Sequence, residues 1–301
     1  MSRAGRRPAH EGGRGPEAGL RRRAFAAIAA QGALLAAACS PIGVLNGLAP
    51  DRLYRDGIAY GPEKRHRLDL YRPVGPGPFP VAVFLYGGGW DSGDRAMYRF
   101  VGGAFAQAGF LTVIPDYRVW PAVRYLGCLQ DCAAAFAWTR REIAGFGGEA
   151  GAPALIGHSA GAYNAAMLAL DPALLGAHGL SAQRDVARLI GLVGPYDFLP
   201  LETDELRQIF GPGTAGPDTQ PISYVDGRNP PALLLAGTDD KTVRPANTER
   251  LAARIRERGG VVRSRLYPGI DHREIVGAIG TPLRFLCPTL RDCVDFLRAA
   301  A

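Results

Sequence analysis

The chain has 301 residues, of which 47% are hydrophobic, and its formal net charge is +7. This length and apolar content allow one large core, and no stretch in the middle of the sequence is typical of a linker, so we expect a single folded domain. Residues 1–24 contain seven arginines and two glutamates, which leaves only +2 for the rest and argues against a nucleic-acid-binding surface on the folded part.

The amino-terminal segment has the order of a secretory signal peptide. Three arginines at 21–23 precede an apolar run from Ala24 to Ala38, which is shorter than the ~20 residues that a bilayer-spanning helix needs. The run ends at Cys39 in a segment resembling a lipoprotein processing site, and Arg22-Arg23 weakly resembles a twin-arginine signal. We therefore predict a leader over 1–39 and export to the periplasm, or a membrane tether through Cys39 at the cell envelope. If 1–39 is only an Ala/Arg-rich extension, a cytoplasmic location follows.

After a linker over 40–53, short apolar runs alternate with helical patterns over 54–301. The expected strands, of which the first two form a hairpin, are 56–60, 67–72, 81–86, 111–115, 154–157, 189–193, 232–236 and 261–267. The expected helices are 99–108, 126–144, 160–170, 246–258 and 282–300. This alternation predicts an α/β fold with a mostly parallel sheet, an amino-terminal antiparallel hairpin and helices on both faces. Residues 197–230, rich in Pro, Gly and Asp, interrupt the alternation, and we expect them to form a short cap.

The cysteines after the leader show no metal-ligand spacing. Cys128 and Cys132 stand four residues apart in a predicted helix, a poor geometry for a disulfide, and Cys293 lies in an apolar helical pattern. Buried free thiols are the favoured interpretation for these and for Cys287, although four cysteines could form two bridges in an oxidising compartment. We predict no structural metal and no cofactor.

The segment Gly157-His158-Ser159-Ala160-Gly161 matches the G-x-S-x-G nucleophile elbow. It follows a predicted strand and precedes a predicted helix, which is the context that the motif requires. A tight strand-to-helix turn exposes the Ser159 hydroxyl, and the Ala160 amide at the helix start faces a developing oxyanion. We therefore predict Ser159 as the nucleophile, against the alternative of a glycine-rich turn with no chemistry.

A second glycine-rich turn, Gly87-Gly88-Gly89, follows the first buried strand. Consecutive glycines let the backbone approach a ligand and present N–H groups to it. We predict the amides of Gly88 and Gly89 as the remaining oxyanion donors. A flexible turn is the alternative.

Serine needs a base within hydrogen-bond reach, and the base needs a carboxylate to fix its tautomer. Only His272 follows the last predicted strand, as the chain order Ser, Asp, His requires. For the acid, Asp240 is preferred over its neighbour Asp239, because Val243 three residues on completes the turn usual at this place. Asp271 is expected to bond the backbone of its own loop.

With these segments, the chain from about Tyr54 onward resembles bacterial carboxylesterases of the hormone-sensitive-lipase and feruloyl-esterase/kynurenine-formamidase-like group. The segments that carry the resemblance are 68–73, 87–90, 116–118, the elbow and the Asp240/His272 pair. The resemblance implies an α/β-hydrolase fold. The family usually has His where this chain has Tyr86, and the long amino-terminal cap of many lipase-like members has no counterpart here, which favours an open, shallow site.

The function predicted from these residues is hydrolysis of small acyl or aryl esters through an acyl-enzyme intermediate. Trp90, Tyr117 and Tyr196 are the expected apolar walls of the substrate site. Hydrolysis of formamides or amides on the same residues is the alternative within the enzyme class. A non-catalytic binding protein is the alternative outside it, since α/β-hydrolase folds are reused in that way.

Overall fold

The computed structural model describes residue 1 and residues 40–211, 213 and 215–299, so the predicted leader and its Cys39 lie outside the described residues apart from Met1. The chain divides into two units, residues 1–44 and residues 45–301. The predicted linker over 40–53 contains helix α2, Pro41–Gly47, which begins in the first unit. The second unit holds the sheet and the helices considered below.

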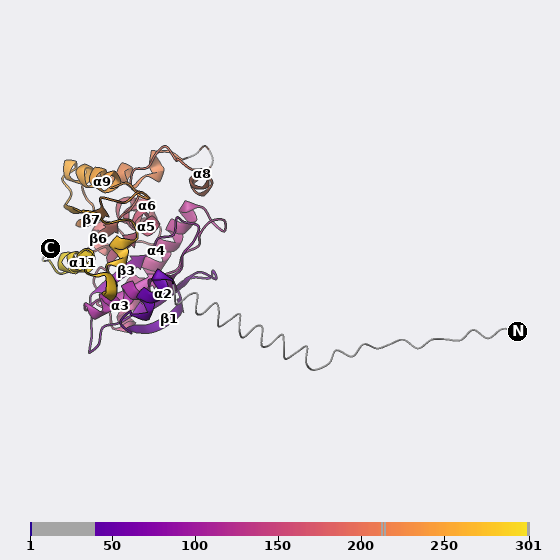
Figure 1. Ribbon diagram of the computed structural model, residues 1–301, viewed down its shortest axis with the longest axis vertical. Coiled ribbons are helices and arrows are strands. Elements are labelled where there is room, and N and C mark those ends of the chain that lie inside the picture. Colours follow the sequence, from indigo (N-terminus) through magenta and orange to yellow (C-terminus); the bar gives the residue numbers. More distant parts are fainter. Residues whose placement is uncertain (2–39, 212, 214, 300–301) are drawn as a thin grey trace. The chain divides into compact units, whose positions relative to one another are not determined.

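An eight-stranded mixed sheet lies at the centre of the second unit (Figure 1), in the order β1-β2-β4-β3-β5-β6-β7-β8. The pairs β1–β2 and β2–β4 are antiparallel, and all other pairs are parallel. The prediction of a mostly parallel sheet with an amino-terminal antiparallel hairpin is therefore confirmed. The strands are β1 (Leu53–Ala59), β2 (Arg67–Tyr71), β3 (Val81–Leu85), β4 (Leu111–Pro115), β5 (Ala154–His158), β6 (Leu189–Leu192), β7 (Ala232–Gly237) and β8 (Val262–Tyr267).

Burial along the strands explains why their sequences are continuous apolar runs. Every residue of β3, β4, β5, β6 and β7 is buried, as expected for parallel strands covered on both faces. Strand β8 closes one edge, and its exposed positions include Arg263 and Arg265. Charged side chains at a sheet edge discourage pairing with another chain.

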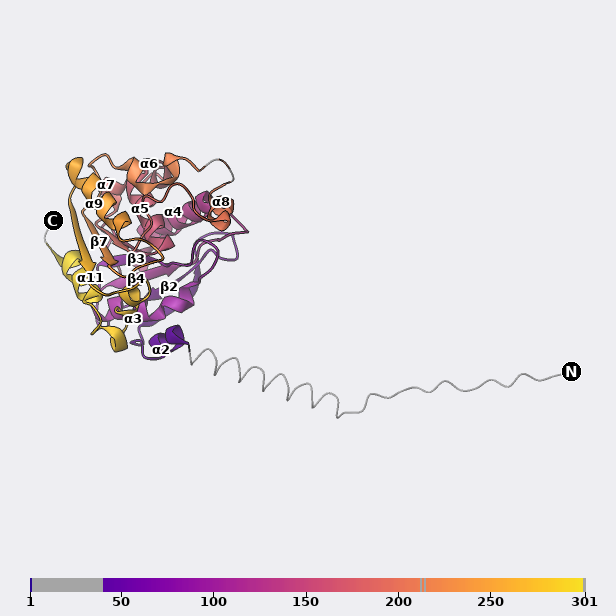
Figure 2. The ribbon, with the colours of Figure 1, turned by 45° about the horizontal axis from the view of Figure 1, so that its top comes forward.

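Two groups of helices cover the sheet. In the first group, α3 (Arg99–Gln107) and α11 (Thr289–Arg298) contact each other. In the second group, α4 (Tyr125–Glu142) and α5 (Ala160–Leu170) pack together. A 3₁₀ turn, Pro221–Tyr224, contacts both α5 and α9 (Ala246–Glu257). Figure 2 shows α3 on the opposite side of β3 and β4 from α4 and α5. Among the described helices, none combines the length and apolar character required to traverse a bilayer.

The carboxyl-terminal helix differs from the prediction over 282–300. The apolar spacing of Leu283, Leu286 and Leu290 indicated one long helix, but the structure has a 3₁₀ turn over Thr281–Leu283 and begins α11 only at Thr289. Inside a continuous helix, Pro288 would remove a backbone hydrogen bond because proline has no N–H. It lies instead at the amino-terminal cap of α11, where the missing N–H costs nothing. The four cysteines Cys128, Cys132, Cys287 and Cys293 are buried free thiols, as favoured from their spacing.

The turn between β5 and α5 depends on two glycines. A Cβ on Gly161 would collide with the carbonyl oxygens of Leu85 and Tyr86 at the end of β3, and a Cβ on Gly157 would collide with the Gly161 carbonyl. Close approach of three backbone segments therefore requires glycine at both flanking positions of the motif. In this way β3, β5 and α5 meet at one point of the sheet edge.

We expect Gly161→Ala to destabilise the protein by up to about 2 kcal/mol, because overpacking against a rigid backbone costs roughly 1–3 kcal/mol and replacing glycine in a helix gains back about 1 kcal/mol. Chemical denaturation measures the difference. Gly176→Ala in α6 (Pro172–Gly176) is the matched control, because a Cβ there meets nothing within 4 Å. Equal stability of the two variants would contradict the packing argument.

Candidate active site

The nucleophile position is a strained turn residue. Ser159 lies between the end of β5 and the start of α5 with φ 54° and ψ −124°. Such a conformation costs a residue with a side chain on the order of 1–3 kcal/mol, so surrounding contacts must hold it. The Ser159 amide donates to the Leu192 carbonyl of β6 at 2.9 Å, and the Ser159 carbonyl accepts from Ala162 and Tyr163.

The structure brings the three predicted catalytic side chains together. Nδ1 of His272 lies 2.7 Å from Oδ2 of Asp240, and Nε2 of His272 lies 2.8 Å from Oγ of Ser159. Because a carboxylate only accepts, Nδ1 carries the proton of the neutral ring, and Nε2 is left to accept the hydroxyl proton of Ser159. The hydroxyl is therefore next to a base in the correct tautomer.

The Asp240 carboxylate is fixed on both oxygens. Its Oδ1 accepts from the amides of Thr242 and Val243, each at 2.8 Å, and only 4% of the residue is exposed. Asp239, the alternative acid, is exposed and accepts from the Thr238 hydroxyl instead. Asp271 accepts from the amides of Arg273 and Glu274, so it organises its own loop as predicted.

His158 forms a second link between the elbow and the base. Its Nε2 lies 3.2 Å from the His272 carbonyl oxygen, which only accepts, so Nε2–H donates, and Nδ1 faces the Tyr98 hydroxyl at 3.4 Å. Burial, together with the neighbouring His272, lowers the pKa of His158 to about 3. The imidazole therefore stays neutral and tethers the His272 backbone, a role that sequence reasoning missed because the motif leaves this position open.

The glycine loop lies directly against the nucleophile. A Cβ on Gly87 would stand 2.8 Å from Cβ of Ser159, so only glycine permits this approach. Gly88 and Gly89 have φ values of 143° and 59°. Within the described chain, no hydrogen-bond acceptor engages the amides of Gly88, Gly89 or Ala160. Gly89 and Ala160 line the same pocket as Ser159, whereas Gly88 does not, and its carbonyl closes the turn by accepting from Asp91 and Ser92.

Tyr86, where the family usually has His, anchors the base of this loop. Its hydroxyl donates to Oδ1 of Asp116 at 2.9 Å and accepts from Nη2 of Arg65 at 2.9 Å, and its ring stacks on Tyr117 with centroids 4.7 Å apart. Burial raises the pKa of Tyr86 and keeps the phenol protonated. The same Arg65 donates to the Gly93 carbonyl at 2.6 Å, so both ends of the loop are held by one partly buried network.

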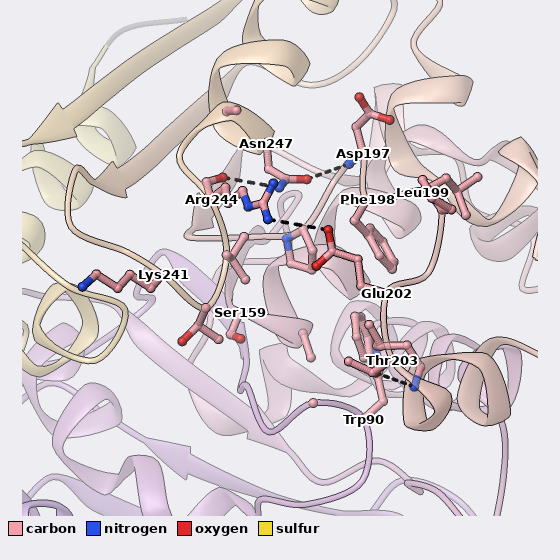
Figure 3. Close-up of a pocket in the computed structure, with 18 of the residues that line it drawn as sticks. Trp90, Ser159, Asp197, Phe198, Leu199, Glu202, Thr203, Lys241, Arg244 and Asn247 are labelled. Carbon is pink, nitrogen blue, oxygen red and sulfur yellow. Dashed lines mark hydrogen bonds and ion pairs between the residues drawn. The ribbon is translucent and has the colours of Figure 1, made fainter.

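Ser159 opens into a cavity of about 490 Å³ (Figure 3). One side is formed by the predicted cap segment, including Phe198, Leu199 and Leu206, and the other by the turn after β7 and the start of α9, including Val243 and Asn247. Two ion pairs lie at its surface: Arg250 with Asp197 at 2.6 Å, and Arg244 with Glu202 at 3.7 Å. The side chains on the cap side belong to segment 197–206, which follows β6 along the chain. Their only sequence signal is that this segment interrupts the strand–helix alternation.

Of the three predicted wall residues, only Trp90 lines the cavity. Tyr117 and Tyr196 are both fully buried in the core, and the expectation that they wall the substrate site is wrong. The Tyr117 hydroxyl donates to the Tyr86 carbonyl at 2.7 Å, beneath the glycine loop. Tyr196 packs its ring against the glycines at 191 and 194, and its neighbours Pro195 and Asp197 contact the cavity instead.

The geometry and fold together define the class of protein. A serine at a strand-to-helix elbow, a histidine after the last strand and an acid after the preceding strand, on this sheet, are the arrangement of an α/β-hydrolase-fold serine hydrolase. Residues 68–255 match the model of the BD-FAE family, and the chain belongs to that family.

Curated relatives of the chain carry esterase names. The chain is 27% identical over 244 residues to a probable isoprenylcysteine alpha-carbonyl methylesterase of Arabidopsis thaliana, covering 73% of this chain and 51% of that protein. It is 31% identical over 223 residues to esterase LipQ of Mycobacterium tuberculosis, covering 67% of this chain and 52% of that protein. The chain thus spans about half the length of these relatives.

Solved structures show the same fold. Propionate-bound esterase 2 of Thermogutta terrifontis superposes with a TM-score of 0.68 at 25% identity, over 82% of this chain and 95% of that one. Esterase B of Lactobacillus rhamnosis superposes with a TM-score of 0.73 at 20% identity, over 91% of this chain and 93% of that one.

The neutral, buried state of His158 predicts a pH dependence of stability. Its pKa is about 3 in the folded chain and near 6.5 when unfolded, so between these values the unfolded chain binds more protons and the free energy of unfolding falls as the pH falls. Relative to His158→Gln, which keeps a side-chain donor but does not titrate, the wild type should lose roughly 1 kcal/mol per pH unit below about 6.5. Urea denaturation between about pH 7 and about pH 4.5 measures this difference. Parallel pH curves for the two proteins would contradict the assignment.

Proposed function

We propose that this protein is a serine carboxylesterase that hydrolyses small acyl or aryl esters through an acyl-enzyme intermediate. The observation that carries the proposal is the 2.8 Å contact between Oγ of Ser159 and Nε2 of His272, at the wall of an accessible cavity. Structural relatives of the fold support a small acyl group: the Thermogutta terrifontis esterase 2 structures include propionate-bound and butyrate-bound forms, and one phosphonylated by sarin.

In the first half of the reaction, Oγ of Ser159 attacks the ester carbonyl carbon while its proton passes to Nε2 of His272. The carbonyl oxygen takes the negative charge and is stabilised by the amides of Gly88, Gly89 and Ala160. The His272 imidazolium, held by Asp240, then protonates the alkoxide leaving group as its bond to carbon breaks. An alcohol leaves, and the acyl group remains on Ser159.

In the second half, water attacks the acyl carbon and gives a proton to His272. Collapse of the second tetrahedral intermediate returns that proton to Oγ of Ser159 and releases the carboxylic acid. No cofactor enters this scheme. The proposed roles of Trp90, Phe198 and Leu206 are to form apolar walls for the ester substituents.

Ser159→Ala should reduce kcat for p-nitrophenyl butyrate by at least ~10³-fold, because the covalent step is lost and only binding and the oxyanion donors remain. A fluorophosphonate probe should label the wild type and leave the variant unlabelled. Ser264→Ala, an exposed serine on edge strand β8, is the matched control and should keep the wild-type rate and labelling. Unchanged turnover in Ser159→Ala would refute the proposal, and an unlabelled wild type would favour the non-catalytic alternative.

A graded panel of substrates, run with the same variants, tests the substrate class. We expect kcat/KM to be highest for p-nitrophenyl esters of short acyl chains and to fall for dodecanoate, because the cavity of about 490 Å³ also has to hold the aryl group. An arylformamide should be a slower substrate. A preference for the formamide over every ester would replace the esterase proposal with the amidase alternative.

We also propose that the protein is exported and held at the cell envelope through Cys39. The support is the order of arginines, apolar run and Cys39 within residues 1–39. Mass spectrometry of protein isolated from the native host should find a mature chain beginning at Cys39 with added lipid. Cys39→Ser should abolish the lipid mass, and an intact Met1 in the wild type would contradict export.

A further inference from the structure

Trp90 is held in a backbone conformation that its side chain disfavours. It follows Gly88 and Gly89 and has φ 66°, so three consecutive residues of the loop lie in the positive-φ region. Among the described residues, only Trp90, Ser159 and Val193 combine a side chain with a positive φ. Since glycine would adopt this conformation without strain, the indole must form contacts that compensate for it.

The indole makes one buried hydrogen bond to the helix that carries the nucleophile. Nε1 of Trp90 donates to Oδ1 of Asn164 at 3.0 Å, and the two residues are 3% and 0% exposed. Asn164 lies in α5, five residues after Ser159. Its Nδ2 lies 3.6 Å from Sγ of Cys132 in α4, a weak acceptor, so the amide oxygen is the atom that faces the indole.

Aromatic contacts fix the plane of the same ring. Trp90 meets Tyr163 edge-on with centroids 5.1 Å apart and Phe210 edge-on at 4.9 Å. Trp90 also lines the cavity, where Figure 3 shows it below Thr203, and its N–H is directed toward Asn164 of α5. The backbone of Trp90 is held as well, since its carbonyl accepts from the Trp120 amide at 2.8 Å.

We infer that Asn164 is a positioning residue for ester hydrolysis, acting through Trp90 to set the spacing of the oxyanion donors. The inference rests on the proposed esterase function. The amides of Gly88 and Gly89 belong to the loop, and the amide of Ala160 belongs to α5. The Trp90–Asn164 bond joins these two elements. Donors to an oxyanion act within about 2.7–3.1 Å, and displacements on the order of 0.5 Å are enough to weaken them.

Asn164→Leu removes the acceptor and leaves the buried indole N–H without a partner. We expect kcat for p-nitrophenyl butyrate to fall roughly tenfold or more, with KM changed by no more than about twofold. This loss is smaller than the ~10²–10³-fold fall in kcat that follows removal of a whole oxyanion donor. Affinity for a trifluoromethyl ketone, which forms an anionic tetrahedral adduct with Ser159, should fall by about the same factor as kcat/KM. A purely structural role would lower the melting temperature without this parallel loss.

Three further variants keep the test decisive. Trp90→Phe keeps an aromatic ring but removes the indole N–H together with part of the ring system. The double variant, Trp90→Phe with Asn164→Leu, should be no slower than the slower of the two single variants. Asn164→Asp keeps an acceptor at the same place and should restore most of kcat relative to Asn164→Leu. Thr139→Val in α4 removes another buried side-chain hydrogen bond, from Oγ1 to the Ala135 carbonyl at 2.9 Å, and should leave kcat unchanged.

Wild-type kcat and ketone affinity in Asn164→Leu or in Trp90→Phe would overturn the inference. Additive losses in the double variant would overturn it as well, because the two side chains would then act separately. Failure of the esterase proposal is distinguishable, since it appears as unchanged turnover in Ser159→Ala. If Ser159→Ala is inactive and Asn164→Leu is fully active, only the positioning role is refuted.

Discussion

The close approach of the β3 end, the glycine loop and the β5–α5 turn is the constraint on which the rest of the site depends. Gly161 lies against the carbonyls of Leu85 and Tyr86, and Gly87 lies against the Ser159 side chain. These contacts leave no room for Cβ atoms on the two glycines, and the neighbouring Ser159 has a positive φ. The same crowding places the loop amides beside the serine hydroxyl, so the backbone that strains the nucleophile also brings the donors close to it.

Buried polar side chains hold this strained assembly in place. Asp240 orients His272, and both carboxylate oxygens of Asp240 accept hydrogen bonds. Neutral His158 ties the His272 carbonyl to the elbow. Beneath the glycine loop, the Tyr86 hydroxyl bridges Asp116 and Arg65. Buried polar groups of this kind are favourable when every donor and acceptor has a partner, and they then allow only one arrangement of the loops around them.

The cavity itself is built from less regular parts. Helix α8 (Asp204–Phe210) and the segment before it supply Phe198 and Leu206, and these face the turn after β7 across the opening. Phe210 continues the aromatic contacts from the cap inward to Trp90. Much of the cavity wall therefore comes from a segment that contributes nothing to the sheet. A cap of this kind can change in sequence while the hydrogen bonds between Ser159, His272 and Asp240 stay the same.

The sequence by itself determined the sheet, the elbow and the identity of the Ser159–His272–Asp240 set, because these depend on local patterns. Continuous apolar runs identify buried strands, and the chain order of the three residues follows from where strands end.

The same patterns could not indicate which way Tyr117 and Tyr196 point after their strands, and both lie in the core. Nor could they identify His158 or Asn164 as partners, since each contact joins residues more than 70 positions apart. The break before α11 was also missed, because apolar spacing alone outweighed the signal of Pro288. Only tertiary packing decides such side-chain directions and long-range bonds, since they depend on which neighbours occupy the remaining space.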